Sequence, residues 1–383
     1  MIDFNTIRQY NFPTVIRFGA GAVKELPGHL LANGLARPLL VTDPMVAQLD
    51  FFKQIKKDLE AKSVSVEVFS DIHKNPVKSD VLKGKEAFKE TSRDCIIGIG
   101  GGAAMDVARA IVLSINHHRD LFDYDDLIGG DQYVTETVPY FITVPTTSGT
   151  GSEAGRSAII SEDETHRKRI LFSPKLLAKI IFADPLLTMD LPPFVTAATG
   201  MDALTHNMEA FIAKGFHPMC DGIALEGITL INESIADAVN KPGLAPRSKM
   251  MIASLMGAVA FQKGLGVVHS LAHPLSAFLD THHGLANAVN LPYGMQFNIA
   301  GFEDKFKRMA IAMNLEEQTG EAVVNHLFEL NQQVNMPLKL SAIGVKQEHI
   351  ETLSDLAFAD FCHPNNPKPV TRADFKTLYT AAL

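Results

Sequence analysis

"DCIIGIGGGAAMDVARAIVLSI", residues 94–115, joins a short apolar run to a helical pattern through a group of glycines. The run does not alternate polar and apolar residues, which is typical of a strand that is covered on both faces. Gly98, Gly100, Gly101 and Gly102 lie at its end, directly before the helical pattern. A strand, a tight turn and a helix in this order predict one unit of an open, mostly parallel α/β sheet.

The same pattern recurs through the first half of the chain. Further β-branched or aliphatic runs with helical stretches between them occupy residues 38–43, 64–69, 140–152 and 179–185. Beyond the Pro192-Pro193 pair these runs stop, and the remaining sequence shows helical patterns separated by loops rich in Pro and Gly. We therefore expect an α/β domain over residues 1–187 and an all-helical domain over residues 188–383.

Composition narrows the class of protein. A chain of 383 residues is long enough for two domains, and its net charge of -8 argues against nucleic acid or an anionic membrane as the main partner. The three cysteines are too few and too scattered for a disulfide framework or a thiolate metal site. The longest apolar run, 250–261, is too short to span a bilayer, and the first residues show no secretory signal. These features predict a soluble, cytoplasmic protein.

The glycine turn suggests a phosphate-binding site, because backbone N–H groups at a helix N-terminus can approach a phosphate there. Tight strand-to-helix turns also need glycine, so the turn alone leaves both interpretations open. In the usual dinucleotide fingerprint an acidic residue follows the glycines by about twenty positions. Here the candidate, Asp43, precedes them. Asp43 could bind an adenosine ribose and repel a 2′-phosphate, which would favour NAD over NADP, or it could cap the next helix.

Hydroxyl side chains are dense in "VPTTSGTGSEA", residues 144–154, directly after an apolar run. Open α/β sheets bind ligands at the carboxyl ends of their strands, so Thr146, Thr147 and Thr150 are candidates for ligand binding. Turn chemistry in the loop could explain part of this pattern.

Candidate metal ligands lie in two segments of the second half. "GMDALTH", residues 200–206, places Asp202 and His206 at i and i+4 on one helix face. The segment 264–287 contains four histidines, namely His269, His273, His282 and His283. One carboxylate with two or three imidazoles suits Fe(II), Zn(II), Mn(II) or Co(II). For any single histidine, a helix cap or a satisfied core position remains the alternative.

Two of these histidines have neighbours that restrict them. Pro274 should bias His273 away from helical torsions, so we do not expect His269 and His273 both to face one ion. His282 and His283 are adjacent and should point in different directions, so we expect at most one of them to bind.

Taken together and in this order, the motifs resemble the iron-containing (group III) alcohol dehydrogenases. The resemblance covers nearly the whole chain and rests most on "DALTH" and on "HSLAHP" followed by "HHGLAN", with support from "GIGGGAAMD", "PTTSGTGSEA", "DPLLTMDLPP" and "NPKPVT". It implies an N-terminal α/β domain with a mostly parallel, Rossmann-like sheet and an all-α C-terminal domain, in a dehydroquinate synthase-like architecture.

The resemblance also implies a set of site residues. One divalent metal, Fe(II) or alternatively Zn(II), would be bound by Asp202, His206, His269 and His283, with His273 beside it as a proton relay. NAD would be contacted by Asp43, Asn75, Gly101, Gly102, Asp106, Thr146, Thr147, Thr150 and Lys168. Ala103 and Gly155 depart from the family pattern, where many relatives have Ser and Thr.

The implied function is a metal-dependent, NAD(H)-linked alcohol dehydrogenase or aldehyde reductase that transfers hydride between an alcohol bound to Fe(II) and nicotinamide. A hydroxy-acid dehydrogenase of the same family, with a substrate like 4-hydroxybutyrate, is the alternative, and Arg156 or His363 could then meet the substrate carboxylate. A dehydroquinate synthase-like lyase fits less well, because the metal-site segments lack Lys and Arg; a non-catalytic NAD or metal sensor is a further alternative. A small alcohol or aldehyde is the expected partner, and a homodimer is the default assembly.

Overall fold

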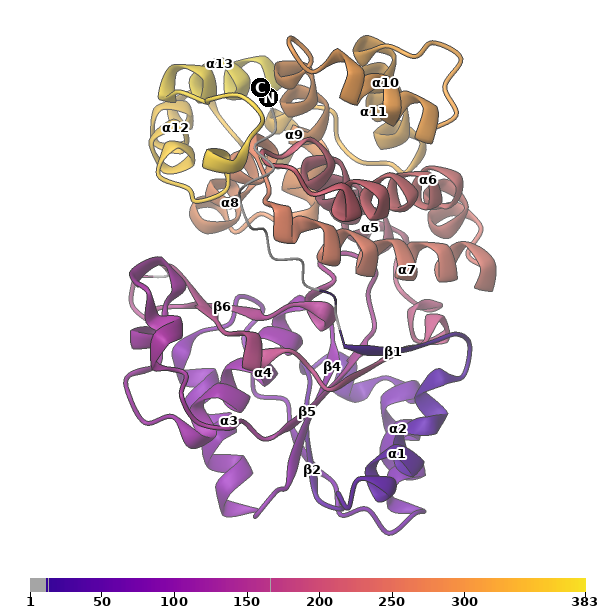
Figure 1. The fold of residues 1–383 in the computed structure, drawn as a ribbon, viewed down its shortest axis with the longest axis vertical. Helices are drawn as coiled ribbons and strands as arrows, with labels where there is room; N and C mark the ends of the chain where they lie inside the picture. The colour runs from indigo at the N-terminus through magenta and orange to yellow at the C-terminus, as the bar shows by residue number, and fades with distance from the viewer. Residues whose placement is uncertain (1–11, 13, 166) are drawn as a thin grey trace. The chain divides into compact units, whose positions relative to one another are not determined.

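The structure, a computed structural model, describes residues 12, 14–165 and 167–383 (Figure 1). These residues group into two compact units. One comprises residues 14–147 and 151–188, and the other comprises residues 148–150 and 189–383 together with residue 12.

A six-stranded sheet forms the centre of the first unit. Its strands are β1 (Val15–Phe18), β2 (Pro38–Val41), β3 (Glu67–Phe69), β4 (Cys95–Gly100), β5 (Tyr140–Pro145) and β8 (Ile180–Ala183). Their order is β1-β8-β5-β4-β2-β3, and all neighbouring pairs are parallel. Every run expected to be a strand contains one, although β3 covers only the end of its run. The edge strand β1 was not expected from the sequence.

Helices cover both faces of this sheet (Figure 1). One face packs against α1 (Leu26–Ala32) and α2 (Asp50–Glu60), and the other against α3 (Lys78–Glu90) and α4 (Gly102–Asn116). Because β4 is buried along its whole length, its side chains are apolar on both faces, which explains the continuous apolar run in the sequence. The expected parallel α/β architecture is confirmed.

A hairpin that the sequence did not reveal is attached to α4. Strands β6 (Ser157–Ser161) and β7 (Lys168–Phe172) form a separate antiparallel pair. Arg109, fully buried on α4, donates to the carbonyl oxygen of Ser157 at 2.7 Å and also to that of Ser152. These hydrogen bonds connect the segment 152–157 to α4, and a charged guanidinium makes stronger hydrogen bonds than a neutral donor.

Glu153, in the same segment, predicts a pH dependence of stability. Its side chain is buried, its Oε1 has no hydrogen-bond partner among the described residues, and burial raises its pKa from 4.5 to about 7. Between these values the unfolded chain has released the proton that the folded chain retains. The free energy of unfolding should therefore fall by up to about 3 kcal/mol as the pH rises from about 4.5 to about 7.

We expect Glu153→Gln to remove most of this slope, because glutamine keeps the shape of the side chain and does not ionise. Urea unfolding at pH 5 and at pH 8 measures it, with the exposed Glu60→Gln as the control. Parallel pH dependence in the wild type and in Glu153→Gln would contradict this prediction.

The second unit is helical. Its helices are α5 (Pro193–Ile212), α6 (Pro218–Asn240), α7 (Leu244–Ala260), α8 (Val267–Leu279), α9 (His283–Asn298), α10 (Glu303–Ala312), α11 (Gly320–Gln333), α12 (Ile350–Phe358) and α13 (Arg372–Ala382). No strand occurs in residues 189–383, all of which the structure describes, as expected. Helix α5 is buried from Thr196 onward except at Thr199, because α6, α7 and α9 pack around it.

The expectation for Pro274 was wrong. Helix α8 continues through Pro274, so His273 has helical torsions. A proline inside a helix removes one backbone hydrogen bond and costs about 3 kcal/mol. Leu271 and Leu275 are completely buried on either side of it, and the packing of this apolar helix outweighs the local preference.

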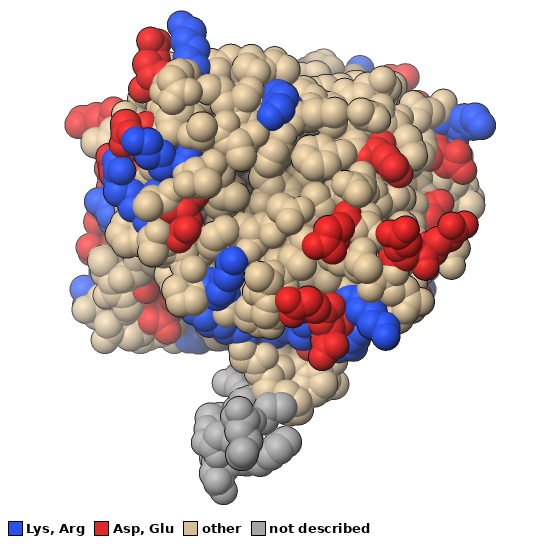
Figure 2. All heavy atoms as spheres, turned by 90° about the horizontal axis from the view of Figure 1, so that it is seen from above, with Lys and Arg blue, Asp and Glu red and all other residues tan. Residues whose placement is uncertain are grey.

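The surface view in Figure 2 shows charged side chains of both signs scattered among uncharged ones on that face. Among the described residues, no single helix is long and apolar enough to cross a membrane. The segments 244–263 and 267–279 are long and apolar enough for this only when they are taken together, and they are bent by 107° relative to each other.

Candidate metal centre

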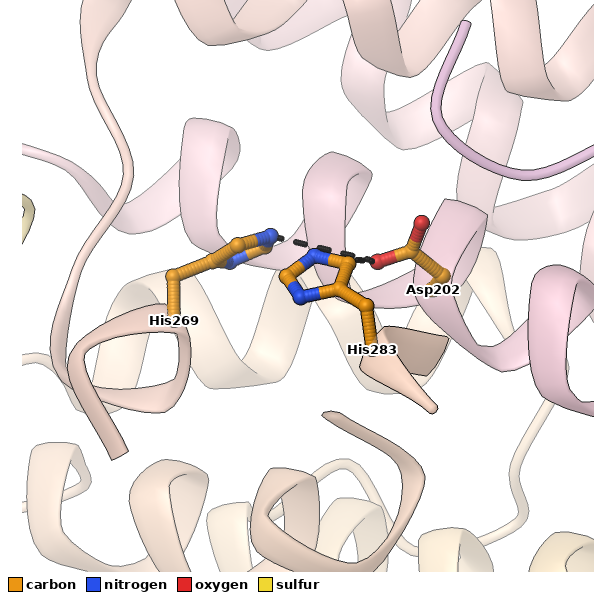
Figure 3. Close-up of side chains that lie close together, drawn as sticks. All are labelled: Asp202, His269 and His283. Atoms are coloured by element: carbon orange, nitrogen blue, oxygen red, sulfur yellow. Dashed lines mark ion pairs between the residues drawn. The ribbon is translucent and has the colours of Figure 1, made fainter. Parts of the chain in front are cut away.

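Three helices bring one carboxylate and three imidazoles together. Asp202 and His206 project from α5, His269 from α8 and His283 from α9. Figure 3 shows Asp202, His269 and His283 pointing toward one another. The Nε2 atoms of His283, His269 and His206 lie 3.4, 3.9 and 4.0 Å from the same atom, Asp202 Oδ1.

These donor atoms fit a divalent cation. Donors bound tetrahedrally at about 2.1 Å from an ion lie about 3.4 Å apart, close to the separations found here. Asp202, His206 and His269 are at most 5% exposed, and His206 Nδ1 has no hydrogen-bond partner among the described residues. Burial raises the pKa of Asp202, but the neighbouring imidazoles, His206 above all, outweigh it and keep the carboxyl ionised. A hard oxygen with three nitrogens suits a catalytic first-row metal.

Two residues that the sequence analysis missed support this cluster. Asn287 donates from Nδ2 to Asp202 Oδ1 at 2.7 Å, and Glu209 Oε2 lies 2.6 Å from His269 Nδ1. Both could have been found by helical spacing, since Glu209 follows Asp202 by seven positions and Asn287 follows His283 by four, which places each pair on one helix face.

His273 lies beside the cluster but is held by other groups. Its ring stacks on His283 at 5.4 Å and on Phe361 at 5.5 Å, and its Nδ1 lies 2.7 Å from Asp360 Oδ2. Burial raises the pKa of Asp360, but His273 and a hydrogen bond from the Ser270 hydroxyl leave it well below the usual range. This carboxylate therefore accepts from Nδ1–H. Asp360 lies 87 positions from His273, and no pattern in the sequence predicted that the two side chains meet.

His282 occupies a different position from its neighbour. It is the residue before α9, and its ring lies 6.1 Å from that of Phe194. The potential ligand atoms that all lie within 4.8 Å of one another belong to Asp202, His269 and His283. His282 is outside this group, and so is His206, although its Nε2 lies 4.0 Å from Asp202 Oδ1. That at most one of these two histidines binds an ion stays a prediction.

The predicted nucleotide contacts of the first unit gather at one edge of the sheet. Asp43, Asn75, Gly101 and Thr146 follow β2, β3, β4 and β5, which are adjacent parallel strands, and Gly102 and Thr147 lie beside them. The carboxyl ends of these four strands meet at the same edge of the sheet, where open α/β sheets bind ligands. Gly100 has a φ of +148°, and a Cβ there would lie 2.8 Å from the Cβ of Ala104. Only glycine allows α4 to begin this close to β4.

Some predicted contacts have clear roles within the fold. Asp43 Oδ1 accepts from the backbone N–H groups of Met45 and Val46 at 3.0 and 2.9 Å. This oxygen therefore caps the turn that follows, which was the alternative to ribose binding. Asp106 accepts from the Ser152 hydroxyl at 2.9 Å, and burial raises its pKa to about 6. Lys168 begins β7 and interacts electrostatically with Asp106.

Three further candidates lie elsewhere. Thr150 belongs to the short segment 148–150, which groups with the helical unit. The guanidinium of Arg156 lies 5.3 Å from the ring centre of Phe172, and burial lowers its pKa. His363 stacks on Phe358, and its Nε2 lies 2.9 Å from the carbonyl oxygen of that residue.

Comparison with known proteins gives a consistent result. Residues 13–185 match the family described as "Iron-containing alcohol dehydrogenase", and residues 196–383 match "Fe-containing alcohol dehydrogenase family, C-terminal". The chain is 36% identical to a 4-hydroxybutyrate dehydrogenase of Cupriavidus necator, over 97% of this chain and 98% of that protein.

Solved structures agree with this match. The crystal structure of a 1,3-propanediol oxidoreductase superposes with a TM-score of 0.94 at 30% identity, covering 98% of this chain and all of that chain (100%). Sulfoacetaldehyde reductase from Bifidobacterium kashiwanohense, in complex with NAD+, superposes with a TM-score of 0.87 at 26% identity, covering 98% and 99% of the two chains.

Proposed function

Because the chain belongs to the iron-containing alcohol dehydrogenase family and is an oxidoreductase acting on small alcohols or aldehydes, we propose that it couples this activity to Fe(II) and NAD(H). The observation that carries the proposal is the convergence of three imidazole Nε2 atoms on Asp202 Oδ1 within 4.0 Å. The ligand set is Asp202, His206, His269 and His283, with Zn(II) as the alternative metal.

In the proposed reaction, the bound cation and NAD supply the hydride chemistry, and His273 handles the proton. When bound, the cation would supply a Lewis acid that lowers the pKa of the substrate hydroxyl, and NAD would supply the hydride acceptor. His273 exchanges the proton released by the alcohol. Since its Nδ1–H is donated to Asp360, its Nε2 is the nitrogen that can take up this proton. Reduction of an aldehyde reverses these steps.

The first 187 residues form the dinucleotide-binding domain in this proposal, and residues 188–383 form the metal-binding domain. The NAD contacts are Asp43, Asn75, Gly101, Gly102, Asp106, Thr146, Thr147, Thr150 and Lys168. The gathering of several of them at the carboxyl edge of the sheet supports this, and so does the relative whose structure contains NAD+. The other carboxylate oxygen of Asp43, Oδ2, would favour NAD over NADP by repelling a 2′-phosphate.

A hydroxy acid is the second candidate substrate, because a relative of 36% identity is named a 4-hydroxybutyrate dehydrogenase. Arg156 or, alternatively, His363 is the residue proposed to meet its carboxylate. We also propose a homodimer, the commonest assembly of soluble enzymes, and a reducing, cytoplasmic setting, which the three free cysteines support.

The test is NADH oxidation by the anaerobically purified protein with a panel of aldehydes and semialdehydes. We expect turnover to disappear after chelation and to return with Fe(II), and we expect NADPH to be the poorer donor. Faster turnover of succinate semialdehyde than of uncharged aldehydes would favour the hydroxy-acid candidate. Absence of turnover with Fe(II) and with Zn(II), in protein that still binds NADH, would refute the proposal.

A further inference from the structure

Glu209 connects the two helices that carry most of the candidate ligands. It lies on α5, one turn beyond His206, and only 1% of it is exposed. Its carboxylate accepts from the backbone N–H of Val268 at 2.7 Å and of His269 at 3.3 Å, and from His269 Nδ1 at 2.6 Å. The backbone N–H of Gly266 also donates to it. All four donors are at the beginning of α8.

The buried start of α8 explains why an acceptor is needed there. The first N–H groups of a helix have no partner within the helix, and here Gly266 has no side chain that could cap them. Asn366 Oδ1 accepts from Val267 at 3.2 Å, and Glu209 accepts from the N–H groups on either side. A Cβ on Gly266 would lie 3.0 Å from Glu209 Oε1, so glycine lets the carboxylate approach closely.

The hydrogen bond to the ring determines which nitrogen of His269 can bind a cation. A neutral imidazole carries its proton on one nitrogen and a lone pair on the other. Both oxygens of Glu209 accept backbone N–H groups, so the carboxyl group is an acceptor toward Nδ1 as well. This leaves the lone pair on Nε2, the atom that lies 3.9 Å from Asp202 Oδ1. His206 Nδ1 has no hydrogen-bond partner among the described residues. Of the two histidines, only His269 therefore has a carboxyl group at Nδ1.

We propose that Glu209 is a positioning residue of the metal centre, which holds His269 in its metal-binding tautomer and fixes the start of α8 against α5. This inference rests on the proposed ligand set. Carboxylates that orient a ligating histidine typically change metal affinity about 10- to 100-fold when they are replaced.

Glu209→Gln is the decisive variant. Its amide has one acceptor and one donor group, so it cannot accept all four N–H groups, and a donor facing Nδ1 would favour the wrong tautomer. We expect its affinity for Co(II), measured by competition with a chelator, to fall about 10- to 100-fold, with a changed Co(II) absorption spectrum. Glu153→Gln, the same substitution at a buried carboxylate of the other unit, should leave the affinity unchanged.

The outcomes separate this inference from the proposed ligand set. If Asp202→Asn weakens Co(II) binding and a folded Glu209→Gln does not, the role of Glu209 is wrong and the ligand set stands. If Asp202→Asn has no effect, the ligand set itself fails. Should Glu209→Gln not fold, Glu209→Asp decides: its shorter carboxylate cannot reach all four donors, so wild-type Co(II) affinity in that variant would overturn the inference.

Discussion

Replacing Asp202 with asparagine is expected to lower kcat/KM by at least about 1,000-fold and to abolish tight binding of a divalent cation. Asp202 Oδ1 is the atom on which all three imidazole Nε2 atoms converge. An asparagine amide lacks the negative charge that offsets the cation, and it offers one oxygen donor in place of two. The loss therefore includes both the affinity for the metal and the polarisation of the substrate oxygen.

Metal content and NADH oxidation, measured on the same anaerobic preparations across a titration with Fe(II), test this prediction. Asp237→Asn is the matched control, because Asp237 is exposed on α6 outside the cluster. Recovery of wild-type activity by Asp202→Asn at ordinary Fe(II) concentrations would show that the carboxylate is not a ligand.

Gly284→Ala is expected to destabilise the helical unit by about 3 kcal/mol and to weaken metal binding at the same time. A Cβ on Gly284 would lie 2.2 Å from the carbonyl oxygen of Ala198 and 2.7 Å from its carbonyl carbon. Both atoms are backbone of α5 and cannot rotate away, so α9 must move. Because Gly284 follows His283 directly, this movement would carry His283 away from Asp202.

Thermal unfolding with and without Zn(II) measures both effects. Gly222→Ala is the control on α6, where a Cβ would meet nothing within 4 Å. Since alanine has the higher helix propensity, that variant should be stabilised by up to about 1 kcal/mol. An unchanged midpoint for Gly284→Ala would mean that the close approach of α5 and α9 is dispensable.

Most of the fold could be predicted from local patterns. The apolar runs and the glycine turn predicted five of the six strands in the parallel sheet, because a strand covered on both faces must be apolar throughout. The edge strand β1 was missed, since three of its four residues are exposed and it has no such pattern. Helix α8 differed at Pro274 because burial of its neighbours outweighs the local torsional preference.

The candidate site divides in a similar way. Asp202 and His206 could be paired from their spacing on one helix, whereas their combination with His269 and His283 depended on resemblance to a family. Tertiary structure then placed all four side chains around one carboxylate oxygen. The pairing of His273 with Asp360 joins residues 87 positions apart, and no local periodicity connects them.

By itself, the sequence determined which elements form and which side chains have the chemistry to bind a cation, because periodicity and residue type are local properties. Only the tertiary structure decided which nitrogen of His269 faces Asp202 and which faces Glu209. That choice depends on a hydrogen bond to Glu209, 60 positions away, and such a bond exists only once the two helices have packed together.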